Sequence, residues 1–175
     1  ERAFVQDLKK IKGGGDLLKD KHSIAYKYSL GGGYGKSDGW EPFGIVDYYD
    51  TFGPELSLVQ SLQAKLEGSF AIAKYTHSGS QIIDWTPEGS MAKDRHLYPG
   101  FLSFVKKSIE ELEVKGSDVE LAGIFYHVGE NDMSFHPYRK QAAERLQAII
   151  NQSRKDLGMP ELKWFVSQQP PTDDK

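Results

Sequence analysis

The chain has 175 residues, of which 38% are hydrophobic and 27% charged, and its formal net charge is −3. This length is enough for one domain with its own core, and the composition disfavours a nucleic-acid binder, which usually needs a basic surface to neutralise phosphates. The sequence contains no cysteine, which excludes a disulfide scaffold, a thiolate metal site and a cysteine nucleophile, and no apolar run long enough to predict a membrane span.

The first 50 residues are predicted to be rich in loops. Residues 2–10 could form a short helix, and residues 24–30 could form a strand. Three glycines at 13–15 and four more within 31–35 favour long loops around these two segments.

A phosphate-binding loop is the first functional motif to consider in this region, because Gly35-Lys36-Ser37 has the ending of that motif. The motif also needs a glycine where Leu30 stands, and it should lead into a helix, which Gly39 and Pro42 would break. We therefore predict a surface loop here and reject nucleotide binding.

From residue 51 to residue 168, helical and strand-like segments alternate, and residues 169–175 form a tail. Apolar residues recur at helical spacing in three segments, which are residues 54–67, 99–114 and 137–157. Three short apolar segments are predicted to be buried strands, at residues 69–76, 119–128 and 162–167, and a loop fills residues 77–100. Such alternation needs crossover connections, so it predicts an α/β fold, a three-layer α/β/α sandwich with a mostly parallel sheet.

Two turns at the carboxyl ends of predicted strands are candidates for a functional site. Gly129-Glu130-Asn131-Asp132 follows one strand, and His77-Ser78-Gly79-Ser80 follows another. Open α/β sheets build their sites at these strand ends, so the two turns could aim a backbone N–H and a side-chain amide at one point, as in an oxyanion hole. Asn and Asp are also common turn formers and helix caps, so local structure explains a single such tetrapeptide equally well.

The five histidines do not predict a metal site. No two of them have the i, i+4 spacing that a helical zinc motif requires. Solvated or hydrogen-bonded histidines are the simpler explanation.

Several sequence blocks resemble the SGNH hydrolases, which are α/β esterases with a flavodoxin-like sheet. Gly129-Glu130-Asn131-Asp132 resembles their Gly-x-Asn-Asp block. More narrowly, residues 51–168 are similar to the sialate O-acetylesterase-like domain, also called carbohydrate esterase family six. The similar segments are, in chain order, Gly53-Pro54-Glu55-Leu56-Ser57, Lys74-Tyr75, Ser78-Gly79-Ser80-Gln81, Trp85, His127-Val128-Gly129-Glu130, Tyr138 and residues 157–162.

The resemblance implies a role for each residue of the candidate site. Gly79, through its backbone N–H, and Asn131, through its side-chain amide, would bind the oxyanion, while Glu130 would orient the catalytic histidine. The residues implied to line the substrate cleft are Ser80, Trp85 and His127. The resemblance also implies an acetylated carbohydrate as the partner, with neither a metal nor an organic cofactor.

The sequence departs from the family pattern at two positions in these blocks. Val128 stands where the family has a glutamine, and Ser78 stands where it has the first glycine of a pair. Both departures leave the two oxyanion donors in place and concern the fine substrate preference.

Two family blocks have no counterpart at all. The nucleophile belongs to a Gly-Gln-Ser block, which the sequence lacks. Gly14-Gly15-Asp16-Leu17 faintly resembles a Gly-Asp-Ser-Leu block, but Leu17 stands where the serine should be. The base belongs to an Asp-x-x-His block, and the sequence contains no Asp-x-x-His. Because both absences lie outside the similar span and on opposite sides of it, we expect residues 1–175 to be a single esterase domain that is incomplete at both ends.

Two classes of function stay open at this point. In the first, the parent protein is a serine esterase that removes acetyl groups from carbohydrate hydroxyls, with its Ser and His outside these residues. The 175-residue chain alone is then expected to be inactive. In the second, the chain is a non-catalytic, glycan-binding relative of the same fold.

Overall fold

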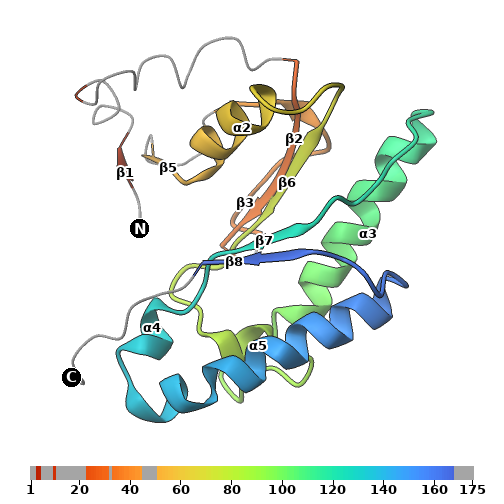
Figure 1. Cartoon of the computed structure of the whole chain (residues 1–175). Helices are drawn as coiled ribbons and strands as arrows, with labels where there is room; N and C mark the ends of the chain where they lie inside the picture. Colours follow the sequence, from red (N-terminus) through yellow and green to blue (C-terminus); the bar gives the residue numbers. More distant parts are fainter. Residues whose placement is uncertain (1–2, 5–9, 11–22, 32, 45–50, 168–175) are drawn as a thin grey trace. The chain divides into compact units, whose positions relative to one another are not determined.

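The computed structural model describes residues 3–4, 10, 23–31, 33–44 and 51–167, and it divides into two compact units, Glu1–Thr76 and His77–Lys175. The elements of the first unit are β1 (Ala3–Phe4), β2 (Ala25–Leu30), β3 (Gly35–Lys36), β4 (Glu41–Pro42), β5 (Thr51–Phe52), α2 (Glu55–Gln63) and β6 (Ala71–Tyr75) (Figure 1). Those of the second unit are the 3-10 helix η2 (Ile82–Trp85), α3 (Tyr98–Val114), β7 (Ile124–Tyr126), α4 (Glu130–Met133), α5 (His136–Asp156) and β8 (Trp164–Val166). The described residues thus form a mixed α/β structure with small sheets.

The first unit is organised around β2. This strand pairs in parallel with β6, from Ala25 opposite Ala71 to Ser29 opposite Tyr75, and antiparallel with β3 and β4. Helix α2 adds its apolar side to the core of this unit. The buried residues of that core are Ile24, Tyr26, Phe43, Leu56 and Val59.

The segment that ends in Gly35-Lys36-Ser37 is a hairpin. Gly35 and Lys36 form β3, which pairs antiparallel with the end of β2. A phosphate-binding loop would instead join a strand to a helix, so this geometry agrees with the rejection of nucleotide binding.

The short helix predicted over residues 2–10 is wrong at its start. Ala3 and Phe4 form β1, which pairs antiparallel with β5 at Thr51 and Phe52. The pairing partner lies far along the chain, and such long-range pairing overrides local helix propensity. Residues 5–9 lie outside the described residues.

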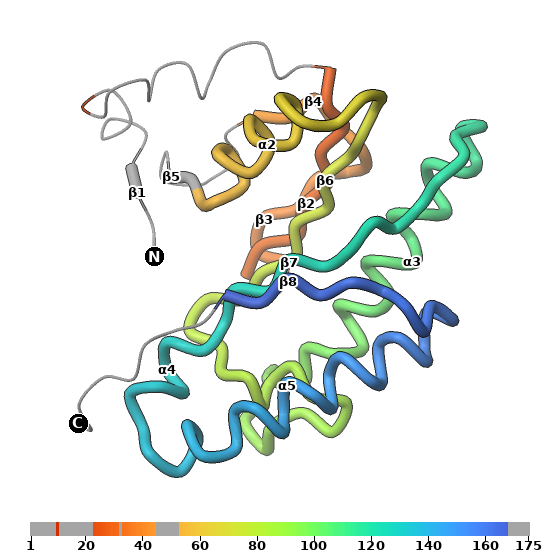
Figure 2. The backbone as a smooth tube through the Cα atoms, viewed as in Figure 1, coloured from red at the N-terminus to blue at the C-terminus, as the bar shows by residue number. Residues whose placement is uncertain are grey.

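The second unit is organised around the parallel pair β7 and β8, whose backbones run side by side in Figure 2. One face of the pair carries Tyr126 and Trp164, which pack in an aromatic cluster with Trp85 of η2 and Phe101 of α3. The other face carries Phe125 and Phe165, which are 50% and 55% exposed. The core of this unit therefore lies on the face of the pair that meets η2 and α3.

The predicted helices and strands differ from the observed ones mainly in length. Helices α3 and α5 begin and end within one residue of their predicted bounds. The strand predicted over residues 119–128 is confirmed only as β7, after Gly123. A Cβ on Gly123 would lie 2.9 Å from Cε2 of Phe165, so the glycine permits this close approach of the two strands. None of the helices in the described ranges is long and apolar enough to cross a membrane.

Candidate functional site

The loop that follows β6, here called the His77–Trp85 loop, was predicted to lack regular structure, but it contains η2. A capping box explains this helix. Gln81 is its N-cap, the Gln81 N–H donates to Asp84 Oδ2 at 2.8 Å, and the Gln81 side chain accepts from the backbone of Asp84. Gln81 and Asp84, three residues apart, are the local signal from which η2 could have been predicted.

Two polar side chains inside the loop bind each other. Trp85 Nε1 donates to Ser80 Oγ at 3.0 Å, and Ser80 Oγ donates to the carbonyl oxygen of His77 at 2.9 Å. Ser80 is 9% exposed and Trp85 is 6% exposed. Both residues, predicted to line a substrate cleft, therefore support the loop from its buried side.

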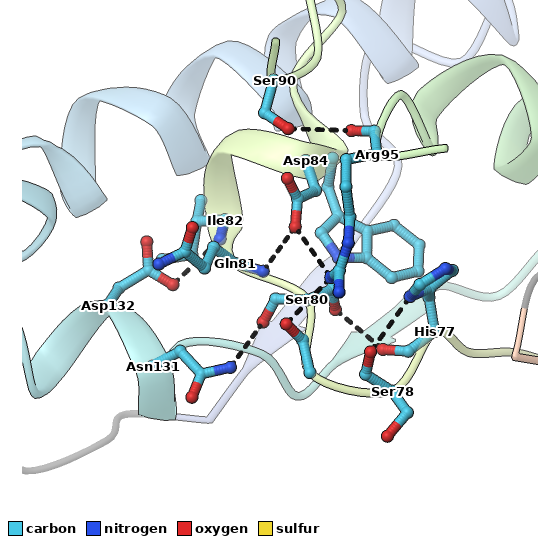
Figure 3. A network of polar contacts seen from close by, with 12 residues as sticks. His77, Ser78, Ser80, Gln81, Ile82, Asp84, Ser90, Arg95, Asn131 and Asp132 are labelled. Carbon is cyan, nitrogen blue, oxygen red and sulfur yellow. Dashed lines mark hydrogen bonds and ion pairs between the residues drawn. The ribbon is translucent and has the colours of Figure 1, made fainter. Parts of the chain in front are cut away.

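Arg95 binds the same loop from the chain segment before α3 (Figure 3). Its Nη1 donates to the carbonyl oxygen of Gly79 at 2.8 Å and to Asp84 Oδ2 at 3.3 Å. Gly79 has φ +64°, a left-handed conformation that glycine adopts at little cost. Among the described residues, none accepts a hydrogen bond from the Gly79 N–H, so this donor stays available while the following peptide is fixed. No sequence pattern pointed to Arg95.

The second predicted turn lies against this loop. Gly129, with φ +135°, precedes α4, and the next residues carry the candidate side chains. Asn131 is exposed, and its Nδ2 lies 3.4 Å from the carbonyl oxygen of Ser80, a long hydrogen bond. The structure thus brings the side-chain amide of Asn131 to the carbonyl group of Ser80, the residue that follows Gly79. The roles of Gly79 and Asn131 as oxyanion donors stay predictions.

Asp132 contacts the same loop as its neighbour Asn131, but from a buried position. It is 0% exposed, and its Oδ2 accepts a hydrogen bond from the Ile82 N–H at 2.9 Å. Burial raises the pKa of this carboxyl above its ordinary value, and Asp84 adds to the rise. The Ile82 hydrogen bond and the charge of Arg145 act against it. Oδ1 of Asp132 has no hydrogen-bond partner within the described part of the chain.

Glu130 and His127 are both exposed. Glu130 is the first residue of α4, and His127 follows β7. Nδ1 of His127 lies 2.7 Å from Oγ of Ser167, which follows the neighbouring strand β8. The resemblance implies that Glu130 orients the catalytic histidine, and no histidine of this chain was predicted to have that role. The role of Glu130 therefore also stays a prediction.

The described residues were also considered for metal ligands and cavities. Among the described residues, no group of three or more His, Asp or Glu is placed to hold a metal ion. A cavity of about 330 Å³ is lined by Thr86, Glu88, Gln141, Glu144, Arg145 and Ala148. None of these lining residues belongs to the predicted site.

Comparison with known proteins identifies the family. The family described as carbohydrate esterase, sialic acid-specific acetylesterase, matches residues 40–171. No curated protein has a significantly similar sequence. The solved structure of a protein from Arabidopsis thaliana is similar with a TM-score of 0.58 and 15% identity, over 86% of this chain and 60% of that chain, a likeness that concerns the fold alone. Because the family match spans more than half of the sequence and confirms the resemblance of its motifs, the chain belongs to the sialic acid-specific acetylesterase family of carbohydrate esterases.

Proposed function

We propose that this chain supplies the oxyanion-binding part of a carbohydrate O-acetylesterase, which removes acetyl groups from glycan hydroxyls by a serine mechanism. The observation that carries the proposal is the contact between the two predicted turns. Asn131 Nδ2 lies 3.4 Å from Ser80 O, and Arg95 Nη1 fixes the Gly79 carbonyl at 2.8 Å. The two candidate donors are therefore held by one network of polar contacts, as preorganised stabilisation of an oxyanion requires.

The chemistry follows from these donors and from two groups outside the chain. A serine attacks the acetyl carbonyl, a histidine takes the serine proton, and the carbonyl oxygen becomes the oxyanion. The Gly79 N–H and the Asn131 amide donate to that oxyanion, and one such donor lowers the barrier by about 3–4 kcal/mol. The tetrahedral intermediate then expels the sugar oxygen, which receives the proton from the histidine, and water hydrolyses the acetyl-serine to acetate.

The serine and the histidine are proposed to lie in segments of the parent protein outside these 175 residues. The sequence has neither a Gly-Gln-Ser block nor an Asp-x-x-His block, and the chain spans 60% of the similar Arabidopsis structure. Glu130, exposed at the start of α4, is the proposed partner that orients this histidine.

The proposal extends to the sheet and to the substrate cleft. Both parallel pairs, β2 with β6 and β7 with β8, suit a three-layer α/β/α sandwich, and the fold likeness over 86% of the chain supports that architecture. For the cleft, the exposed ring of His127 is the proposed contact with the acetylated sugar. Ser80 and Trp85, which are buried, support the cleft through the His77–Trp85 loop.

A comparison of the complete protein with this chain tests the proposal. Both are incubated with an O-acetylated sugar and with an aryl acetate, and released acetate is measured. We expect turnover by the complete protein, loss of turnover on replacing the serine of its Gly-Gln-Ser block by alanine, and none by the 175-residue chain. A complete protein that binds the acetylated glycan but releases no acetate would contradict the esterase and favour the glycan-binding alternative.

A further inference from the structure

We propose that Asp132 is a positioning residue of this site, whose buried carboxylate joins the His77–Trp85 loop to α4 and thereby fixes the two oxyanion donors relative to each other. The inference rests on the proposed function, because it assigns Asp132 a part in the reaction of Gly79 and Asn131. Asp132 itself touches no reacting atom in this account. It acts through the backbone of the loop.

The contact that carries the inference is long-range and buried. Asp132 Oδ2 accepts the Ile82 N–H at 2.9 Å across 50 residues of sequence, and Asp132 is 0% exposed. Ile82 is the first residue of η2, so its N–H is one of the donors that a helix start leaves without an internal partner. A carboxylate from α4 therefore caps a helix that belongs to the other turn.

The loop is held at two successive amides by two different carboxylates. The Gln81 N–H donates to Asp84 within the loop, and the Ile82 N–H donates to Asp132 outside it. Asp84 also accepts a hydrogen bond from Arg95, which donates to the Gly79 carbonyl oxygen as well. The path from Asp132 to Gly79 thus runs through η2 and Arg95. Figure 3 labels Asp132, Asp84 and Arg95 along this path.

The neighbouring residue Asn131 holds the loop less firmly than Asp132 does. Its contact with Ser80 O is 3.4 Å long, and its side chain is exposed, where water competes for the same groups. A hydrogen bond to a buried carboxylate is charge-assisted and stronger. The two adjacent residues therefore have different roles. Asp132 holds the loop, and the amide of Asn131 stays available to a substrate.

The environment of Asp132 is costly, which supports a role beyond packing. One of its two carboxylate oxygens has no partner within the described residues, and a buried polar atom left unpaired lowers stability. Burial also raises the pKa of this carboxyl. Groups perturbed by burial in this way cluster at functional sites.

Amide hydrogen exchange of the 175-residue chain, followed by NMR, tests the contact without any catalysis. In Asp132→Ala we expect the Ile82 N–H to exchange about 10- to 100-fold faster, as for loss of a hydrogen bond to a charged group. The resonances of the Gly79 N–H and the Asn131 side-chain amide should shift. Asp118→Ala, the same substitution at an exposed aspartate, should leave all three unchanged.

Asp132→Asn is a second, more conservative variant, needed because Asp132→Ala could fail to fold. Its amide oxygen can still accept from Ile82, so exchange should be faster than in the unchanged protein and slower than in Asp132→Ala. If the Ile82 N–H exchanged in Asp132→Ala at the same rate as in the unchanged protein, the proposal would be overturned. Loss of protection throughout α3 and α5 in Asp132→Asn would also overturn it, because Asp132 would then serve the whole fold rather than the loop.

The complete protein supplies the second measurement. Asp132→Ala should lower kcat about tenfold or more with little change in KM, and Asp132→Asn should restore part of kcat, as expected when transition-state donors are misplaced. Faster exchange with unchanged kcat would overturn the positioning role. A complete protein that releases no acetate at all would contradict the proposed function, while the exchange data would still show whether Asp132 holds the loop.

Discussion

Two turns in this chain each contain a glycine in the left-handed conformation, and different contacts hold them. Gly31, between β2 and β3, has φ +59°, and Gly79, in the His77–Trp85 loop, has φ +64°. Main-chain bonds hold the first turn: the Gly31 N–H donates to Thr76 O at 2.8 Å and the Gly33 N–H to Leu30 O at 3.1 Å.

The second turn is held by side chains from distant segments. Arg95 and Asn131 donate hydrogen bonds to its carbonyl oxygens, and Asp132 accepts one from a backbone N–H. Glycine content and positive φ therefore do not distinguish a connecting turn from a candidate site in this chain. The distinction lies in which residues hold the turn, and the predictions below test it.

The largest difference in stability is expected between Trp85 and Tyr34. Trp85 is 6% exposed, packs edge-on against Phe101 and Tyr126, and binds Ser80, whereas Tyr34 in the β2–β3 turn is 79% exposed. Trp85→Ala should lower the free energy of unfolding by about 3–5 kcal/mol, because it empties a packed site. Tyr34→Ala should change it by about 0.5 kcal/mol. Urea denaturation measures both, and equal losses would contradict the distinction.

Alanine at the two glycines separates stability from catalysis. Gly79→Ala and Gly31→Ala should each lower the free energy of unfolding by about 1–2 kcal/mol, the cost of left-handed backbone. Space allows the methyl group at both, since the nearest atoms would lie 3.9 Å and 3.4 Å from the new Cβ. In the complete protein, only Gly79→Ala should slow acetate release, because it disturbs an oxyanion donor. Equal slowing by both variants would argue against that assignment.

The smallest effect is a pH dependence of stability. The folded-state pKa of Asp132 is raised, chiefly by burial, above the ordinary value of 3.8. Its contribution to stability is therefore full below that ordinary value and is lost as the pH rises through the folded-state pKa. The free energy of unfolding, measured from pH 3 to pH 7, should fall with pH relative to that of Asp132→Asn. Parallel curves, or a difference of opposite sign, would contradict the raised pKa.

Local sequence signals predicted the two long helices well and the long-range contacts poorly, and α2 ends at Gln63, four residues before its predicted end. Helices α3 and α5 match their predicted bounds closely because each has a regular apolar stripe and a proline in its first turn. The pairing of Ala3–Phe4 with Thr51–Phe52 was missed because its partners lie far apart in the sequence. η2 was missed although Gln81 and Asp84 have the spacing of a capping box.

The candidate site follows the same rule. The expectation that the strand-end turns approach each other rested on a general property of α/β sheets, and the Asn131–Ser80 contact joins them. Arg95 was not predicted because an arginine in a loop has no characteristic pattern. The packing of Trp85 was not predicted because the family resemblance implied a place in the substrate cleft, and its neighbours Phe101 and Tyr126 are distant in sequence.

The most direct test of the central claim is the rate of acetate release by the complete protein carrying Asn131→Ala. Asn151→Ala, on helix α5 and outside the site, is the matched control. We expect Asn131→Ala to lower kcat about 10²- to 10³-fold with an unchanged circular dichroism spectrum, as for loss of one oxyanion donor. The control should retain the rate of the unchanged protein. An Asn131→Ala variant that releases acetate as fast as Asn151→Ala would contradict the assignment of the oxyanion site.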